Sequence, residues 1–169
     1  IEERLKVFRD KIKEIKFKRR EAKLAELEIQ RRTREEARAI LDAQKRENEI
    51  KQKVVERLEK YSRNMKSIVF QVNKRYLTKK RSPLVFIDNI ADSGECFIKN
   101  QDTPDNDYLF LLYIKGENAS ERLINDISLE DKTDLPETKV FNPKNVFEAS
   151  DYIIDRLALL FEKERSVKK

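Results

Sequence analysis

The hydrophobic residues in the first 82 positions recur at the spacing of a helix that packs against another helix. Near the start of the chain, intervals of four and three residues separate Ile1, Leu5, Phe8, Ile12 and Ile15. The same intervals return closer to residue 82, at Val54, Leu58, Tyr61, Met65, Ile68 and Val72. This is the heptad pattern of coiled coils, in which apolar side chains of two helices interlock. Both sets are therefore predicted to be oligomerisation contacts.

The stretch between these two sets, from about Arg19 to Gln52, is far more polar. Where the first seam would continue, the chain carries Arg19, Glu26, Thr33 and Glu36. The two seams are thus interrupted or out of simple register. We expect a coiled coil with a weak, strongly charged centre. A single solvated helix is the alternative for this middle stretch.

Residues 1–82 contain no glycine and no proline, so nothing in them would break a helix. Acidic residues repeatedly precede basic ones by four positions, as in Glu14–Lys18 and Glu28–Arg32, which is the favourable orientation for helical ion pairs. A helix this long and polar cannot bury its apolar stripes alone. A partner helix is therefore expected along residues 1–82.

Residues 83–169 hold all four prolines and both glycines, and their apolar residues are grouped in short runs. Strands are predicted near 84–90, 95–100 and 108–115. The last of these runs is apolar without alternation, which indicates a central strand covered on both faces. Residues 120–127 fit either a short helix or a strand. Residues 128–139 are acidic and polar and are predicted to be a loop, followed by a short edge strand at Val140 and Phe141.

The clearest element of this second part is a helix over about 145–163. Its start has two candidate caps: Asn142 followed by Pro143, or Asn145 with Glu148 three residues later. The predicted fold class is α+β. A long coiled-coil helix, 1–82, is followed by a small antiparallel-sheet domain, 83–169, closed by a C-terminal helix. We expect that helix on one face of the sheet, and residues 61–77 or a second chain on the other.

Charge divides the chain at the same point. Residues 1–82 hold 27 Lys and Arg against 14 Asp and Glu, a net charge of +13, whereas residues 83–169 carry a net charge of −7. Clustered cations in the first part could neutralise phosphates of a nucleic acid. The alternative is a solvated helix face balanced by interleaved glutamates. The candidates for phosphate contacts are Lys18, Arg19, Arg20, Arg31, Arg32, Arg34, Lys79, Lys80 and Arg81.

Residue types that carry most enzyme chemistry are missing. The chain has no histidine, which removes the commonest general base and most zinc sites. The single cysteine, Cys96, falls in a predicted strand and is expected to be a buried structural thiol. Two glycines cannot build a phosphate-binding loop, and the acidic stretch 102–107 lacks the spacing of a calcium loop. We therefore expect no enzyme, and no catalytic, cofactor-binding or metal-ligating residues. No run approaches the ~20 apolar residues of a membrane span.

The order of these elements resembles coiled-coil subunits of kinetochore and monopolin complexes. In those proteins a dimeric helical stalk, here 1–82, leads into a small head of the RWD type, here the strands and the helix 145–163. The resemblance implies a scaffold subunit that dimerises through its stalk and docks protein partners through its head. It also implies a chromosome-associated, nuclear location rather than a cytoplasmic one. Subunits of tethering and autophagy complexes share this layout.

A homodimer is expected because symmetric assemblies are the commonest, with a heterodimer as the alternative. The single cysteine fits a reducing, intracellular compartment. A nucleic-acid-associated protein with a basic stalk is the second functional hypothesis.

Overall fold

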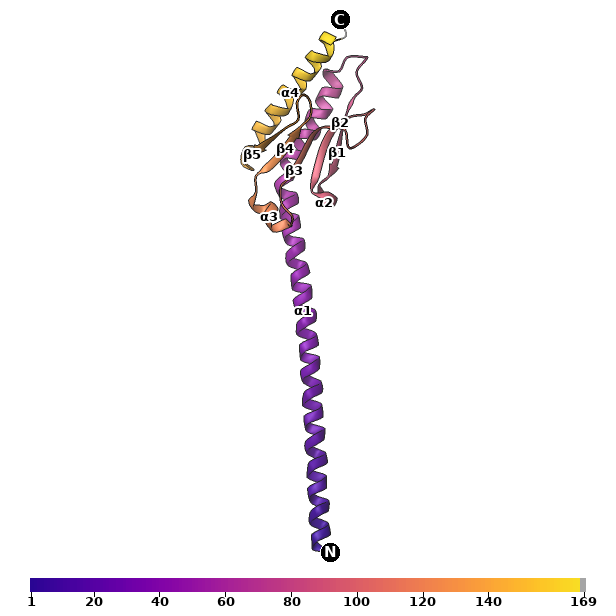
Figure 1. Cartoon of the computed structure of the whole chain (residues 1–169), viewed down its shortest axis with the longest axis vertical. Helices are drawn as coiled ribbons and strands as arrows, with labels where there is room; N and C mark the ends of the chain where they lie inside the picture. Colours follow the sequence, from indigo (N-terminus) through magenta and orange to yellow (C-terminus); the bar gives the residue numbers. More distant parts are fainter. Residues whose placement is uncertain (168–169) are drawn as a thin grey trace. The chain divides into compact units, whose positions relative to one another are not determined.

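The computed structural model describes residues 1–167 and confirms the α+β class. Helix α1 runs over Glu2–Arg75 and is followed by a five-stranded antiparallel sheet (Figure 1). Helix α4, Val146–Val167, closes the described chain. The chain divides into two compact units, residues 1–47 and the part from Asn48 onward. The second unit therefore includes the C-terminal part of α1, which the sequence grouped with the stalk.

The first unit, residues 1–47, is helical from Glu2, and nearly all of its side chains are exposed. Ion pairs within the helix link charges one turn apart, such as Lys18 with Glu14 at 3.3 Å. Arg31 binds both Glu28, at 2.6 Å, and Glu35, at 3.5 Å. Exposed pairs of this kind add little stability each. Because nearly all of the side chains are exposed, this unit has no buried core of its own within the described residues.

The sheet of the second unit is a meander, with strands in the order β1-β2-β3-β4-β5 and every neighbouring pair antiparallel. The first three strands lie where the sequence predicted them. Short helices α2, Ile90–Ser93, and α3, Ala119–Ile124, lie in the connections. The strands are β1 Leu84–Asn89, β2 Glu95–Asn100, β3 Tyr108–Ile114, β4 Ile127–Asp131 and β5 Glu137–Phe141.

The predicted loop over residues 128–139 is wrong, because this segment holds β4 and most of β5. Ile127 and Leu129 are fully buried on one face of β4, and Asp131 follows them on that face with 0% exposure. The segment reads as a loop because Asp131 and its neighbours are acidic. Its burial depends on hydrogen bonds from α4, which lies elsewhere in the sequence.

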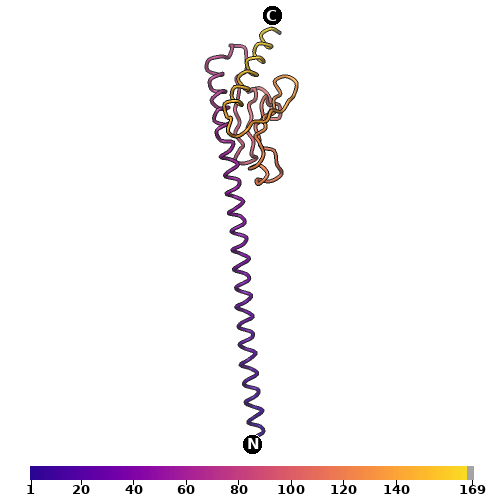
Figure 2. Tube along the Cα trace, turned by 90° about the vertical axis from the view of Figure 1, so that its left-hand side faces the viewer, coloured from indigo at the N-terminus to yellow at the C-terminus, as the bar shows by residue number. Residues whose placement is uncertain are grey.

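Both long helices pack on the same face of the sheet. Met65 of α1 lies with its sulfur 3.9 Å from that of Cys96 on β2, and Tyr152 and Arg156 of α4 bind Asp131 on β4. The strand register places Cys96 and Asp131 on one face through β3. Figures 1 and 2 show α4 and the C-terminal part of α1 side by side on one side of the sheet. The expectation that these helices would cover opposite faces is therefore wrong.

The opposite face of the sheet is only half covered. Leu111 and Tyr113 on the central strand β3 are partly exposed there, so the prediction that both faces of this strand are covered is also wrong. Phe97 on β2 is buried among neighbours on this face, and its ring centroid lies 6.1 Å from that of Tyr108. Large side chains on adjacent strands therefore shield one another here without a covering helix.

Polar contacts fix α1 to the rest of the second unit at three points. The amide of Asn73 donates to the backbone carbonyl of Leu84 at 2.8 Å and accepts from its N–H at 2.9 Å. The hydroxyl of Tyr61 donates to the carbonyl of Asn142 at 2.6 Å. The guanidinium of Arg57 donates to the carbonyl of Asn125 at 3.0 Å. The end of α1 is therefore an integral part of this fold.

Candidate interaction surfaces

The first predicted seam lies on the exposed helix of residues 1–47. Phe8 is 60% exposed, and Leu5 and Ile15 are about as exposed as it is. Ile12 is the least exposed of the five residues. Intervals of four and three residues bring these side chains to one face, because 3.5 residues is close to one helical turn. The structure therefore presents an apolar stripe that the described residues of this unit leave uncovered.

The same seam extends beyond Ile15, the last residue of the predicted set. Extending the intervals beyond Ile15 reaches apolar residues as far as Val54, alternating with polar ones. The apolar members are Ala22, Ile29, Ile40, Ala43 and Ile50. The alternation hid the repeat, because no two neighbouring heptads in this stretch are both fully apolar.

The second predicted seam is occupied within the chain itself. Five of its six residues are buried in the core formed with the sheet and α4, and Val72 packs against that core. Leu58 is 0% exposed, so it presents no surface to a partner helix in this structure. The buried members are Val54, Leu58, Tyr61, Met65 and Ile68.

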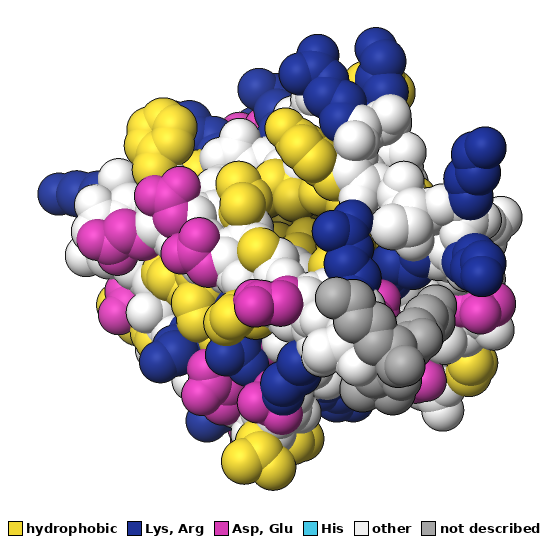
Figure 3. Space-filling view, turned by 90° about the horizontal axis from the view of Figure 1, so that it is seen from above, with side chains coloured by type: hydrophobic (Ala, Val, Ile, Leu, Met, Phe, Trp, Pro, Cys, Tyr) yellow, Lys and Arg dark blue, Asp and Glu magenta, His cyan; other side chains and the backbone are white. Residues whose placement is uncertain are grey.

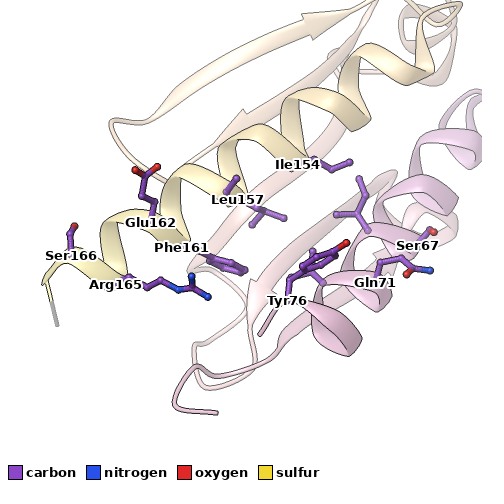
Figure 4. Close-up of a pocket in the computed structure, with 12 residues that line it drawn as sticks. Ser67, Gln71, Tyr76, Ile154, Leu157, Phe161, Glu162, Arg165 and Ser166 are labelled. Carbon is purple, nitrogen blue, oxygen red and sulfur yellow. The ribbon is translucent and has the colours of Figure 1, made fainter. Parts of the chain in front are cut away.

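A groove of about 900 Å³ lies between the end of α1 and α4. Ile68 and Val72 of α1 and Ile154, Leu157 and Phe161 of α4 form its apolar walls. The rings of Phe161 and Tyr76 lie across from each other in it, with Gln71 and Arg165 at its edges (Figure 4). Seen from above, apolar side chains occupy a hollow bordered by Lys and Arg on one part of its rim and by Asp and Glu on another (Figure 3), and Glu162 of α4 lines the groove. No sequence signal marks this groove, because its walls are 80 residues or more apart.

A basic segment lies next to the α1 wall of the groove, whose own lining residues on this side are uncharged. Residues 67–82 carry five cations, Lys74, Arg75, Lys79, Lys80 and Arg81, and no acidic residue. Arg81 is already held in place: its guanidinium binds Glu164 at 2.8 Å and lies 4.4 Å from the centre of the Phe161 ring. The remaining cations give this end of the second unit a positive potential.

The structure separates the predicted phosphate contacts into two groups. Arg81 has a side chain only 9% exposed and bound to Glu164, so it is not positioned for a phosphate. Lys18, Arg31 and Arg32 form ion pairs with glutamates of their own helix. The other candidates are exposed cations: Arg19, Arg20 and Arg34 in the first unit, and Lys79 and Lys80 in the second.

The most connected buried polar group is the carboxylate of Asp131. It accepts hydrogen bonds from the Thr133 hydroxyl at 2.6 Å, from Tyr152 at 2.7 Å and from the Arg156 guanidinium at 2.8 Å. Burial alone would raise the pKa of Asp131, but these hydrogen bonds and the charge of Arg156 hold that pKa below its ordinary value. A carboxylate satisfied in this way stabilises the fold and is not poised to take up a proton.

Other chemically reactive groups are scarce in the part of the chain that the structure describes. Within residues 1–167 no cluster of three or more His, Cys, Asp or Glu could hold a metal ion. Burial raises the pKa of the Cys96 thiol, which keeps it protonated and unreactive. The helices described include none with the length and apolar character needed to cross a membrane.

Comparison of the chain with protein-family models, curated proteins and solved structures finds no match.

Proposed function

We propose that this chain is a non-enzymatic assembly subunit. Its exposed N-terminal helix pairs with a partner helix, and its second unit docks a protein. The apolar stripe of residues 1–47 carries this proposal. A helix with an exposed apolar seam gains stability when that seam packs against another helix. The order of its elements resembles that of kinetochore and monopolin subunits, which supports the proposal of a chromosome-associated scaffold of the nucleus, with tethering and autophagy scaffolds as the alternative.

Self-association at high salt tests whether the stripe is a pairing surface. At about 1 M salt the Debye length is about 3 Å, so charges on the helix are screened while apolar contacts are not. We expect the chain to associate with itself under these conditions in sedimentation velocity. The double variant Phe8→Asp, Ile12→Asp should remain monomeric.

A matched control uses two apolar residues that are exposed on the same helix but lie off the seam, Val7 and Phe17. The double variant Val7→Asp, Phe17→Asp should associate like the unaltered chain. If both double variants associate like the unaltered chain, or if both fail to associate although the unaltered chain does, the stripe is refuted as a pairing surface.

For the second unit, we assign docking to the groove between α1 and α4. Its walls are apolar, the basic residues of 67–82 lie next to its α1 wall and Glu162 lines its α4 wall, which complements an apolar partner segment whose acidic neighbours lie on the α1 side. Grooves between helices commonly accept an amphipathic helix of a partner. We therefore expect its occupant to be a partner helix with one apolar face and acidic flanks.

Nucleic-acid binding is the second candidate, favoured by the exposed cations Arg19, Arg20 and Arg34. Its salt dependence is opposite to that of the seam, because binding to phosphates weakens steeply as salt rises. Tight binding of a DNA duplex at low salt, together with no association at high salt, would favour this candidate over the scaffold.

A further inference from the structure

The seam of residues 1–47 assigns a heptad position to every neighbouring residue. Leu5 and Ile12 occupy a positions, and Phe8 and Ile15 occupy d positions, since a is followed by d after three residues. The e and g positions border the seam on either side. In a coiled coil these flanking residues of one helix face the flanking residues of the other and determine which partner is accepted.

The flanks of this seam are basic or neutral without exception from residue 4 to residue 46. Eight of the thirteen e and g positions in this range are Lys or Arg, and none is Asp or Glu. The acidic residues gather instead at c positions on the outer side of the helix, among them Glu14, Glu21, Glu28 and Glu35. The basic flanking residues are Arg4, Arg9, Lys11, Lys16, Lys18, Lys23, Arg32 and Arg46.

Two copies of this helix would therefore face each other with like charges. In a parallel pair, g of one helix lies near e of the next heptad of the other, so Lys11 would face Lys16 and Lys18 would face Lys23. In an antiparallel pair, g faces g and e faces e, which again opposes cations. Ion pairs with c-position glutamates hold Lys18 and Arg32, but such exposed pairs offset little of this repulsion.

The seam itself also carries charges that a second parallel copy would not match. Arg19 and Glu26 occupy a positions, and Glu36 occupies a d position. In a parallel pair of identical chains, each of these residues would lie opposite the same residue of the second copy. None of these three makes an ion pair within the described chain, although neighbours such as Arg31 and Glu28 do. Buried like charges are strongly unfavourable in an interface.

We infer that the partner of this helix is a different chain, a helix with acidic e and g positions and a mainly apolar seam that carries opposite charges where it meets Arg19, Glu26 and Glu36. This inference rests on the proposed pairing function and specifies the chemistry of its partner. Acidic flanks would meet the eight cations, as in heterodimeric coiled coils whose pairing is set by charge.

An acidic-flanked copy of this same chain provides a defined probe. It carries the six substitutions Arg4→Glu, Arg9→Glu, Lys11→Glu, Lys16→Glu, Lys18→Glu and Lys23→Glu. At about 0.05 M salt, where exposed charges are weakly screened, we expect it to bind the unaltered chain roughly tenfold or more tightly than the unaltered chain binds itself. Titration of a fluorescently labelled probe measures both affinities.

The matched control copy has the same change of charge away from the seam and its flanks. It carries Lys6→Glu, Lys13→Glu, Arg20→Glu, Arg31→Glu, Arg34→Glu and Arg38→Glu, and should bind no better than the unaltered chain binds itself. Equal binding of the two copies, or tight self-association of the unaltered chain at low salt, would overturn the inference. So would a DNA duplex that binds more tightly than the acidic-flanked copy.

The pairing proposal can fail separately. If the chain associates at high salt and also at low salt, the seam pairs but its partner is not selected by charge. If neither the unaltered chain nor the acidic-flanked copy associates at any salt concentration, the pairing function itself is refuted.

Discussion

At the scale of single residues, the carboxylate of Asp131 connects β4 to α4. Its partners Tyr152 and Arg156 lie one helical turn apart on α4, so one acceptor fixes both the position and the rotation of that helix. Arg156 is in turn only partly exposed. Removing a charge from such a buried pair leaves its partner without compensation.

Asp131→Asn should lower the free energy of unfolding by about 2–4 kcal/mol, because it removes the charge opposite Arg156 and weakens several hydrogen bonds. Urea unfolding followed by tyrosine fluorescence measures this, since all five tyrosines lie between residues 61 and 152. Asp134→Asn is the matched control, because Asp134 forms an exposed ion pair with Lys163. Equal effects of the two substitutions would contradict the role assigned to Asp131.

The depressed pKa of Asp131 also predicts how stability depends on pH. The pKa is lower in the folded chain than its ordinary value of 3.8, so the folded state favours the ionised carboxylate. This contribution is fully present above pH 3.8 and is lost as pH falls through the folded-state pKa. The difference in unfolding free energy between the unaltered chain and Asp131→Asn should therefore shrink below that pH. A constant difference down to acid unfolding would exclude this linkage.

At the scale of elements, one helix has two different environments along its length. The seam residue Phe8 is exposed, whereas Leu58 of the same α1 is completely buried against the sheet. A heptad spacing specifies which face of a helix is apolar but not what covers that face. An apolar face with a period near 3.5 residues can pack against a sheet or against a partner helix.

Leu58→Asp should therefore unfold the second unit, not merely separate two chains. Placing a charge in a fully buried apolar site costs more than about 4 kcal/mol, a large part of a domain's stability. Tyrosine fluorescence and thermal unfolding should report loss of the cooperative transition. Phe8→Asp should leave that transition unchanged. A folded, cooperative Leu58→Asp variant would show that α1 does not pack as described.

The groove between α1 and α4 makes a separate prediction. The anionic apolar dye ANS should bind it, and Ile154→Glu should weaken that binding because Ile154 lines the groove and is 48% exposed. Leu159 is similarly exposed on α4 but lies outside this groove, so Leu159→Glu should have little effect. Dye fluorescence titrations compare the two. Equal loss in both variants would indicate that the dye binds elsewhere.

At the scale of the whole molecule, the second unit contains every element of the buried core. That core joins α1 from Val54 onward with the sheet and α4, and includes no residue of the first unit. Independent stability requires a core and satisfied backbone hydrogen bonds, both of which this unit has.

A fragment comprising residues 48–169 should therefore fold cooperatively. Its free energy of unfolding should match that of the full chain within about 0.5 kcal/mol, since the removed residues contribute no core contacts. Urea unfolding by tyrosine fluorescence compares them directly. A fragment that is unfolded or markedly less stable would show that residues 1–47 stabilise the second unit.

The sequence was sufficient for the two long helices and the first three strands, because each has a clear period or a run of apolar residues between breakers. It was insufficient for β4 and β5, where Asp131 and Glu137 suggested solvent exposure. Their placement depends on Tyr152 of α4, whose hydroxyl lies within hydrogen-bond distance of the carboxylates of Asp131 on β4 and Glu137 on β5. A buried polar group whose hydrogen-bond partners lie far away in the sequence leaves no local sequence pattern.

The candidate surfaces were predictable to different degrees. The stripe that begins at Ile1 follows from spacing alone and is exposed in the structure, and its role in pairing stays a prediction. The groove beside Phe161 could not be found, since it exists only when α1 and α4 lie together. The absence of acidic residues from the flanks between residues 4 and 46 was visible in the sequence once Leu5 and Phe8 had been assigned heptad positions.

The buried face of α1 has a further consequence during synthesis on the ribosome. Val54 to Val69 are made before any strand of the sheet, and α4, which completes their cover, is made after all five strands. At about 5–20 residues per second, the roughly hundred intervening residues take on the order of 5–20 s to translate. During that interval the nascent helix exposes an apolar face that is prone to non-specific association. We therefore expect holdase chaperones to bind this chain before it leaves the ribosome.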